Sequence, residues 1–278
     1  MIKDVYGEAI KKATEVRLLL KYNAYQPINI YDVCEKLNAE VRFVDVNMEG
    51  LYVNSKVNPS IFISAQRPAP RRVFTCGHEL GHHIFQDGFK LDVLNSEESS
   101  GFSIEEKRAD TFSAHLLMPI LGISSEFIKR NIDIKQANEK DFYIISSLYS
   151  VGYSTLINHC YYNKLINESN FEKLTKFIPK RVLEKHYNIS KSPVFKVFDS
   201  LLISGINIDL EIDNVIIIPS HFNIDPNYFK ILSRNNNESI YVAKRVGVTN
   251  MITDKGGNFI RIQPKNYIGI AKYRHLEN

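Results

Sequence analysis

The sequence lacks the long apolar segments that export or membrane anchoring requires. Its apolar runs are short, with residues 215–219 as an example, and charged side chains are interspersed through residues 1–20. A signal peptide has a continuous apolar core, and a helix that crosses a bilayer needs about 20 apolar residues. The sequence therefore predicts a protein with no signal peptide and no membrane span.

Cysteine is scarce and does not form a pattern. The three cysteines are odd in number and lie far apart, at Cys34, Cys76 and Cys160. Disulfide frameworks use an even number of cysteines in a short exported chain. Together with the absence of an export signal, this indicates a reducing compartment, and we expect a cytoplasmic protein.

The chain also lacks a strong excess of charge and a basic tail. Its net charge is +4, and the basic residues are spread along the sequence. Proteins that bind nucleic acid over a large surface cluster their lysines and arginines. No strong basic patch supports nucleic-acid binding here, although local contact stays open. Internal repeats are absent too, which excludes a repeat architecture.

Apolar residues make up 44% of the 278 residues, enough for a substantial core in more than one structural unit. We predict an α+β protein with three domains. Residues 1–125 form a domain with a small sheet and helices, residues 126–192 a helical domain, and residues 193–278 a mostly β domain for sensing or docking.

Apolar periodicity supports this division. Steps of three and four residues predict helices over residues 5–20, 71–86 and 104–117, with a short helix after Asn29. Alternation predicts strands over residues 39–45, 51–54 and 60–64. Runs of β-branched residues predict later strands over residues 206–210, 215–218, 239–242, 259–262 and 267–273.

The chemistry-bearing motif lies within the helix predicted over residues 71–86. His78, Glu79 and His82 satisfy the pattern H-E-x-x-H. A spacing of four residues places both imidazoles on one helix face, where they can bind one ion, and neutral imidazole suits zinc. Glu79 is offset around the helix, so it can take a proton from a water beside the metal.

A catalytic zinc site needs a third protein ligand, and the next helix offers carboxylates. Glu106 and Asp110 are one turn apart and share a face. We predict Glu106 as the third ligand and Asp110 as the acceptor for the distal nitrogen of a ligating histidine. Three neighbouring glutamates compete with Glu106 for this role: Glu97, Glu98 and Glu105. The arrangement resembles that of gluzincins, in which E-x-x-x-D follows H-E-x-x-H on a second helix.

Two residues beside the motif are read as structural. His83 points about 100° away from His82, which indicates a polar or rim residue rather than a ligand. Cys76 lies on a different side of the helix, where a small buried apolar residue is expected.

Taken together, residues 72–83 and the block from Glu106 to Pro119 resemble the ImmA/IrrE-type metallopeptidases. In that family a block of the form E-x-x-A-[ND]-x-F-A-x-x-L-L-M-P follows the zinc motif and supplies the third ligand, which corresponds to Glu106. Ser113 replaces a frequent alanine, and His115 also departs from the usual pattern. The resemblance extends over roughly residues 1–125 and implies that they form a zincin-like peptidase domain.

The resemblance implies one catalytic Zn²⁺ ion and a zinc metalloendopeptidase that cleaves a partner protein. The implied partner is a helix-turn-helix transcriptional repressor, whose cleavage derepresses stress, mobile-element or anti-phage genes. Two alternatives stay open: a metal-containing regulator that binds DNA or a partner without proteolysis, and a toxin-like peptidase that acts on a host protein. Glu79 favours proteolysis over the first alternative, because a structural metal site does not need it.

Two further expectations concern binding. Residues 142–156 read as helix, turn and helix, but the second helix offers few basic residues, which favours packing or substrate docking over DNA binding. An extended substrate is expected to pair with the sheet edge around residues 60–64.

Overall fold

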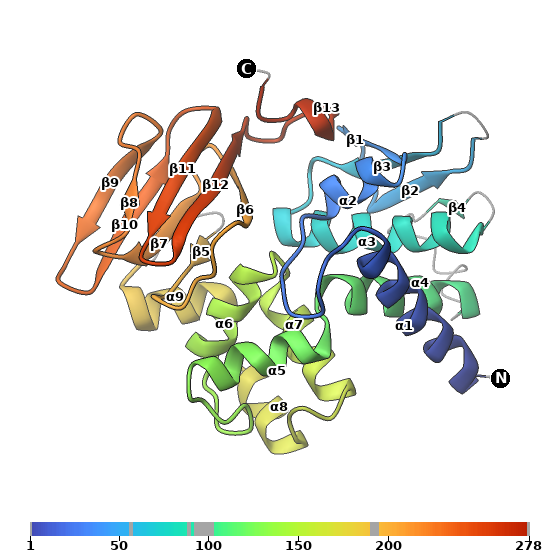
Figure 1. The fold of residues 1–278 in the computed structure, drawn as a ribbon, viewed down its shortest axis with the longest axis horizontal. Helices are drawn as coiled ribbons and strands as arrows, with labels where there is room; N and C mark the ends of the chain where they lie inside the picture. Colours follow the sequence, from blue (N-terminus) through green and yellow to red (C-terminus); the bar gives the residue numbers. More distant parts are fainter. Residues whose placement is uncertain (1, 56–57, 88–89, 92–102, 190–194, 277–278) are drawn as a thin grey trace. The chain divides into compact units, whose positions relative to one another are not determined.

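A computed structural model describes residues 2–55, 58–87, 90–91, 103–189 and 195–276. Contacts between Cα atoms divide the chain into two compact units. Unit 1 comprises Met1–Pro119 and Asn266–Arg274, and unit 2 comprises Ile120–Lys265 and His275–Asn278. Helices and sheets occur in the chain together, which confirms the α+β class (Figure 1).

Unit 1 contains a mixed sheet with the strand order β13-β1-β3-β2-β4. β1 and β3 are parallel, and the other neighbours are antiparallel. Side chains alternate across β1 and β3, so that Phe43, Ile61 and Ile63 are fully buried. The strands are β1 (Glu40–Val44), β2 (Gly50–Val53), β3 (Ser60–Ser64), β4 (Lys90–Leu91) and β13 (Gly269–Ile270).

The expectation that substrate pairs with the edge at residues 60–64 is wrong. β3 occupies those residues and is hydrogen-bonded to β1 on one side and to β2 on the other. Its backbone groups are therefore already used within the sheet.

Helices form the remaining layers of unit 1. In Figure 1, α3 lies next to the sheet and α4 lies next to α3. Asn29 caps α2 and Ser103 caps α4, each by accepting hydrogen bonds from backbone N–H groups. Buried Arg17 of α1 donates to the carbonyl of Leu116, which lacks a partner within its own helix. The helices are α1 (Ile2–Leu19), α2 (Ile30–Lys36), α3 (Ala69–Phe85) and α4 (Ile104–Leu117).

The two helices that carry the motif approach each other closely at Gly81. A Cβ atom at this position would lie 3.0 Å from the Cα of Ala109 and 3.3 Å from the ring of Phe112. Only glycine allows the backbones of α3 and α4 to meet at this distance. The close approach brings the side chains of both helices together.

The outer strand of the sheet comes from a distant part of the sequence. β13 pairs with β1, with Gly269 opposite Phe43, and the guanidinium of Arg274 lies 4.8 Å from the ring centre of Tyr31. The sequence predicted a strand over residues 267–273 and assigned it to the C-terminal domain, whereas it lies in unit 1 and is followed by a short 3-10 helix, Ala271–Tyr273. The division into three domains stays a prediction.

Unit 2 begins with helices. The predicted helix, turn and helix correspond to α6 and α7, with Ser150 in the left-handed region at φ 57° in the turn between them. The helices are α5 (Ile120–Lys129), α6 (Glu139–Leu148), α7 (Tyr153–Tyr162), α8 (Glu168–Thr175) and α9 (Pro179–Tyr187).

Two four-stranded sheets complete unit 2. The first has the order β5-β7-β10-β9 and the second β6-β12-β11-β8. The hydroxyl of Ser147 in α6 accepts from the backbone N–H of Val197 in β5 at 3.1 Å, which fastens the helices to the first sheet. The strands are β5 (Phe195–Val197), β6 (Asn207–Glu211), β7 (Val215–Pro219), β8 (Asn223–Ile224), β9 (Phe229–Arg234), β10 (Glu238–Ala243), β11 (Gly247–Thr253) and β12 (Gly256–Gln263).

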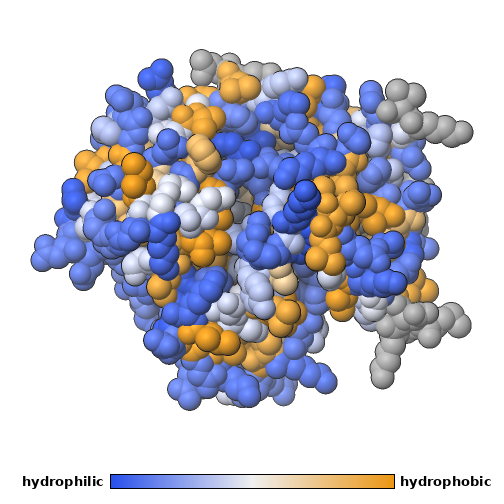
Figure 2. Space-filling view, viewed as in Figure 1, coloured by the Kyte–Doolittle hydropathy of each residue, from blue (hydrophilic) through white to orange (hydrophobic). Residues whose placement is uncertain are grey.

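Within the part of the chain that the structure describes, one stretch, Ile104–Lys129, is long and apolar enough to cross a membrane by length and composition alone. The stretch contains α4 and α5, and 56% of its most apolar window is buried. Core helices of folded proteins pass the same test, so this is weak evidence for a membrane span. On the face shown in Figure 2, apolar residues are interspersed with hydrophilic ones.

Candidate metal centre

The two histidines of the motif lie one turn apart on α3 and are both buried. His78 is 7% exposed and His82 is 2% exposed. Their Nε2 atoms are 3.0 Å apart, and their rings meet edge to face. Each imidazole therefore presents the same nitrogen to a common point.

α4 brings a carboxylate to this point. One oxygen of Glu106 lies 3.1 Å from Nε2 of His78, and the other lies 3.6 Å from Nε2 of His82. The ligand atoms of the three residues lie within 4.8 Å of one another. Two imidazole nitrogens and one carboxylate are a donor set suited to a transition-metal ion with an open position for water.

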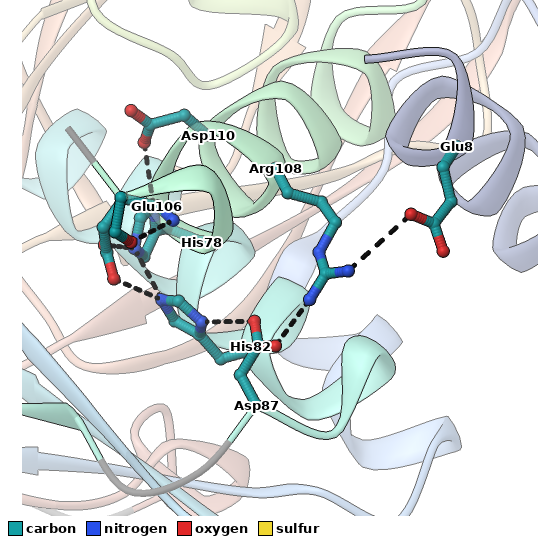
Figure 3. Close-up of polar contacts among 8 residues, drawn as sticks. Glu8, His78, His82, Asp87, Glu106, Arg108 and Asp110 are labelled. Carbon is teal, nitrogen blue, oxygen red and sulfur yellow. Dashed lines mark hydrogen bonds and ion pairs between the residues drawn. The ribbon is translucent and has the colours of Figure 1, made fainter. Parts of the chain in front are cut away.

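Two further carboxylates contact the opposite nitrogens of the rings (Figure 3). Nδ1 of His78 is 2.8 Å from Asp110, and Nδ1 of His82 is 2.9 Å from Asp87. Each carboxylate can accept a hydrogen bond from Nδ1–H, which leaves the unprotonated Nε2 as the ligand atom. The sequence anticipated the contact of Asp110 but not that of Asp87.

Residues 34–158 match the family model for the IrrE N-terminal-like domain, Peptidase_M78. The chain is also 31% identical over 122 residues to the "Uncharacterized immunity region protein 2" of Bacillus phage phi105. This similarity covers 42% of the chain and 74% of the phage protein. The chain belongs to the Peptidase_M78 family. The resemblance identified from the motifs is thus confirmed, and peptidase activity on a protein substrate is supported for the family.

The match to the Peptidase_M78 model includes the three converging residues and extends into α7. It therefore covers α3 and α4, which form the centre, and the helix, turn and helix of α6 and α7. The two sheets of unit 2 lie outside it.

The charged groups around His78, His82 and Glu106 favour binding of a cation. Burial lowers the pKa of His78, but hydrogen bonds with Asp110 and Glu106 outweigh it and raise the pKa to about 10. Burial also opposes protonation of His82, whose pKa is nevertheless raised by hydrogen bonds with Glu106 and Asp87. The two imidazoles hold the pKa of Glu106 well below its usual range. The surroundings therefore stabilise positive charge at the point where the ligand atoms meet.

Glu79 lies on α3 next to the histidines and is 2% exposed. It is not among the three residues whose ligand atoms converge. Gly50 of β2 lies against this side chain. A Cβ atom on Gly50 would lie 2.6 Å from the carboxylate oxygen Oε1 of Glu79. The absent side chain of Gly50 thus leaves room for the carboxylate of Glu79, a role that the sequence did not reveal.

His83 lies one turn after Glu79 and faces the same strand. Its Nδ1 is 3.0 Å from the hydroxyl of Tyr52 in β2. Burial lowers the pKa of His83, which favours a neutral ring. His83 is a half-buried contact to the sheet and, as the sequence indicated, does not join the three converging residues.

The competing carboxylates can also be placed. Glu105 is described and lies outside the converging group, whereas Glu97 and Glu98 fall outside the described residues. Cys76 is fully buried, as expected, and its sulfur lies 3.7 Å from that of Cys34.

Proposed function

We propose that this protein is a zinc metalloendopeptidase with a zincin-like peptidase domain. His78, His82 and Glu106 are its metal ligands, and Glu79 is its general base. The observation that carries the proposal is the convergence of two Nε2 atoms and a carboxylate from two packed helices. Zinc is the proposed ion because this donor set is typical of catalytic zinc.

A bound zinc ion would supply Lewis-acid activation of water and of the peptide carbonyl. The protein's own residues provide orientation and proton transfer. Asp110 and Asp87 hold the imidazoles with Nε2 facing the centre. Glu79 takes a proton from the attacking water and passes it to the leaving amine. The close approach of Gly50 to the carboxylate of Glu79 restricts the positions that this carboxylate can adopt.

The proposed substrate is a partner protein, most specifically a helix-turn-helix transcriptional repressor in the cytoplasm. The name of the phage relative assigns that protein to an immunity region. Cleavage of a repressor would derepress stress, mobile-element or anti-phage genes, in line with the resemblance to ImmA/IrrE-type peptidases.

α6 and α7 are proposed as a packing or docking element rather than a DNA reader. The exposed positions of α7 include Ser154, Asn158 and Tyr162, which carry no positive charge. A DNA-reading helix would present arginine or lysine to phosphate groups.

The deciding experiment compares the native protein with the Glu79→Gln variant on the repressor encoded beside its gene. Native protein loaded with zinc should cleave the repressor, and Glu79→Gln should bind zinc equally well but not cleave. Metal analysis should give about one zinc ion per chain, lost in His82→Ala. Equal cleavage by native protein and Glu79→Gln would remove Glu79 from the mechanism. Binding of the repressor by native protein without any cleavage would support a non-proteolytic regulator instead.

A further inference from the structure

A chain of charged contacts leads from His82 away from the candidate metal centre. Nδ1 of His82 is 2.9 Å from one oxygen of Asp87, whose other oxygen accepts from the guanidinium of Arg108 at 2.5 Å. The guanidinium also lies 3.6 Å from the carboxylate of Glu8 (Figure 3). These contacts therefore connect Asp87, in the turn after α3, to α4 and to α1.

The turn after α3 places Asp87 against His82. Gln86 adopts the left-handed conformation at φ 56°, which reverses the backbone. The backbone N–H of Asp87 then donates to the carbonyl of His82 at 3.0 Å. Main chain and side chain of Asp87 thus both contact His82, so the carboxylate has little freedom to move.

Arg108 ties this carboxylate to the helix that supplies Glu106. It follows Glu106 by two residues on α4, and its guanidinium lies 4.2 Å from the ring centre of Phe85. The side chain of Arg108 is 19% exposed. A guanidinium that is stacked on a ring and partly buried holds its partner more rigidly than an exposed ion pair does.

The two carboxylates that contact the imidazoles differ in their surroundings. The side chain of Asp87 is 8% exposed, whereas that of Asp110 is 62% exposed. Water competes with Asp110 for its hydrogen bond to His78. A hydrogen bond in a buried, less polar environment is stronger and costs more to lose.

We infer that Asp87, held by Arg108, is a positioning residue that fixes the orientation of His82, and that it contributes more to metal binding than Asp110 does. Asp87 accepts a hydrogen bond from Nδ1–H of His82 and so directs Nε2 toward Glu106. The inference rests on the proposed metal centre and adds to it an element that links both ligand-bearing helices.

The primary test measures zinc affinity by competition with a chromophoric chelator. Asp87→Ala should weaken zinc binding by about 10- to 100-fold, the range for loss of such a contact. Asp110→Ala should weaken it by a smaller factor. A weaker affinity in Asp110→Ala than in Asp87→Ala, or an unchanged affinity in Asp87→Ala, would overturn the inference.

A double substitution tests whether Arg108 acts through Asp87. Arg108→Ala alone should lower zinc affinity, and Asp87→Ala with Arg108→Ala should be no weaker than Asp87→Ala alone. Additive losses would show that Arg108 acts independently. Glu8→Gln, at the far end of the chain of contacts, is the matched control and should stay within about twofold of native.

A spectroscopic measurement separates positioning from general destabilisation. In the zinc-loaded native protein, the Nδ1 proton of His82 should give a downfield resonance protected from exchange with water. The resonance should persist in Asp110→Ala and broaden in Asp87→Ala. If Asp87→Ala does not fold, Asp87→Asn removes the negative charge that strengthens the contacts with His82 and Arg108 and should bind zinc several-fold more weakly; native-like affinity in this variant would overturn the inference.

These measurements also separate two kinds of failure. If the native protein binds no zinc, the proposed function fails. If the native protein binds zinc and the Asp87 variants bind it equally well, only the role of Asp87 fails.

Discussion

At the scale of single residues, a missing side chain shapes the site as much as the charged ones do. A Cβ atom on Gly50 would lie 2.6 Å from both Oε1 of Glu79 and Cγ2 of Thr75. Such distances cannot be accommodated without displacing side chains of α3. The position of the proposed general base therefore depends on a residue in the neighbouring strand.

We predict that Gly50→Ala displaces the carboxylate of Glu79. Cleavage should fall by at least about tenfold, because a general base must lie within hydrogen-bond reach of its water. Zinc affinity should change little, since the atoms nearest to the added Cβ belong to Glu79 and Thr75 and not to the three ligands. Urea unfolding should show a loss of about 1–3 kcal/mol from overpacking. The control is Gly7→Ala in α1, where a Cβ atom meets nothing within 4 Å, and it should leave cleavage unchanged.

The residues of the centre divide into those that a motif reveals and those that only the fold reveals. H-E-x-x-H fixed the places of His78 and His82 because helix geometry alone puts them on one face. Asp87 could not be found in this way, since its contact depends on the left-handed conformation of Gln86. Gly50 was missed because its importance comes from an absent side chain against a distant helix.

At the scale of elements, α3 and α4 act as one support for the centre, and their separation is set at Gly81. A larger side chain there meets the backbone of Ala109 at 3.0 Å, and a backbone cannot rotate away as a side chain can. The position of Glu106 relative to the histidines therefore depends on this contact.

Gly81→Val should consequently weaken zinc binding by at least about tenfold, because ligands must be held within about 0.5 Å of their productive positions. Isothermal titration with zinc measures this effect. Gly257→Ala in β12 is the control, since a Cβ atom there has open space around it. Native-like affinity in Gly81→Val would mean that α4 adjusts without moving Glu106.

A second prediction concerns α6 and α9 of unit 2. The carboxylate of Glu139 is 7% exposed and accepts hydrogen bonds from Lys185 and from His186. Burial raises the pKa of Glu139, but these hydrogen bonds outweigh it and lower the pKa below its ordinary value of 4.5. A carboxyl group with a lowered pKa stabilises the fold above its unfolded-state pKa and loses that contribution as the pH falls.

Glu139→Gln should therefore lower the free energy of unfolding at pH 7 by about 1–3 kcal/mol. The deficit should stay constant down to about pH 5 and shrink below about pH 4.5, where the unfolded-state carboxyl takes up a proton before the folded-state carboxyl, with its lower pKa, does. Urea unfolding of both proteins across this range provides the measurement. A deficit that grows on acidification would contradict the assigned role.

How well elements could be predicted depended on how regular their patterns are. α4 was predicted with its observed bounds, Ile104–Leu117, because Ser103 caps its start and Pro119 follows its end. β11 was missed because its buried positions include Thr249 and Thr253, while Val248 and Ile252 are exposed. β9 was missed because all its residues after Phe229 are exposed, so no alternation appears.

At the scale of the whole molecule, all residues of the candidate metal centre belong to unit 1. A ligand that binds only the folded state stabilises it, by about 2.7 kcal/mol at a concentration 100-fold above its dissociation constant. Zinc should therefore stabilise α3 and α4 directly. The sheets of unit 2 contribute no residue to the three converging ligands.

Removal of zinc with a chelator should increase hydrogen exchange in peptides from α3 and α4. Peptides from β9 to β12 should exchange at unchanged rates, because zinc binding affects opening of the unit that contains the site. Mass spectrometry of zinc-loaded and zinc-free protein measures both. Equal increases in both units would show that they open as one cooperative body.

The strand β13 imposes an order of events during synthesis. A ribosome delivers α3 and α4, with every residue of the metal centre, before it delivers Gly269 and Ile270. Until those residues are translated, β1 has no β13 to pair with at its outer edge, and the sheet of unit 1 is incomplete. Completion of the sheet of unit 1 must therefore wait until residues 120–265 of unit 2 have been translated.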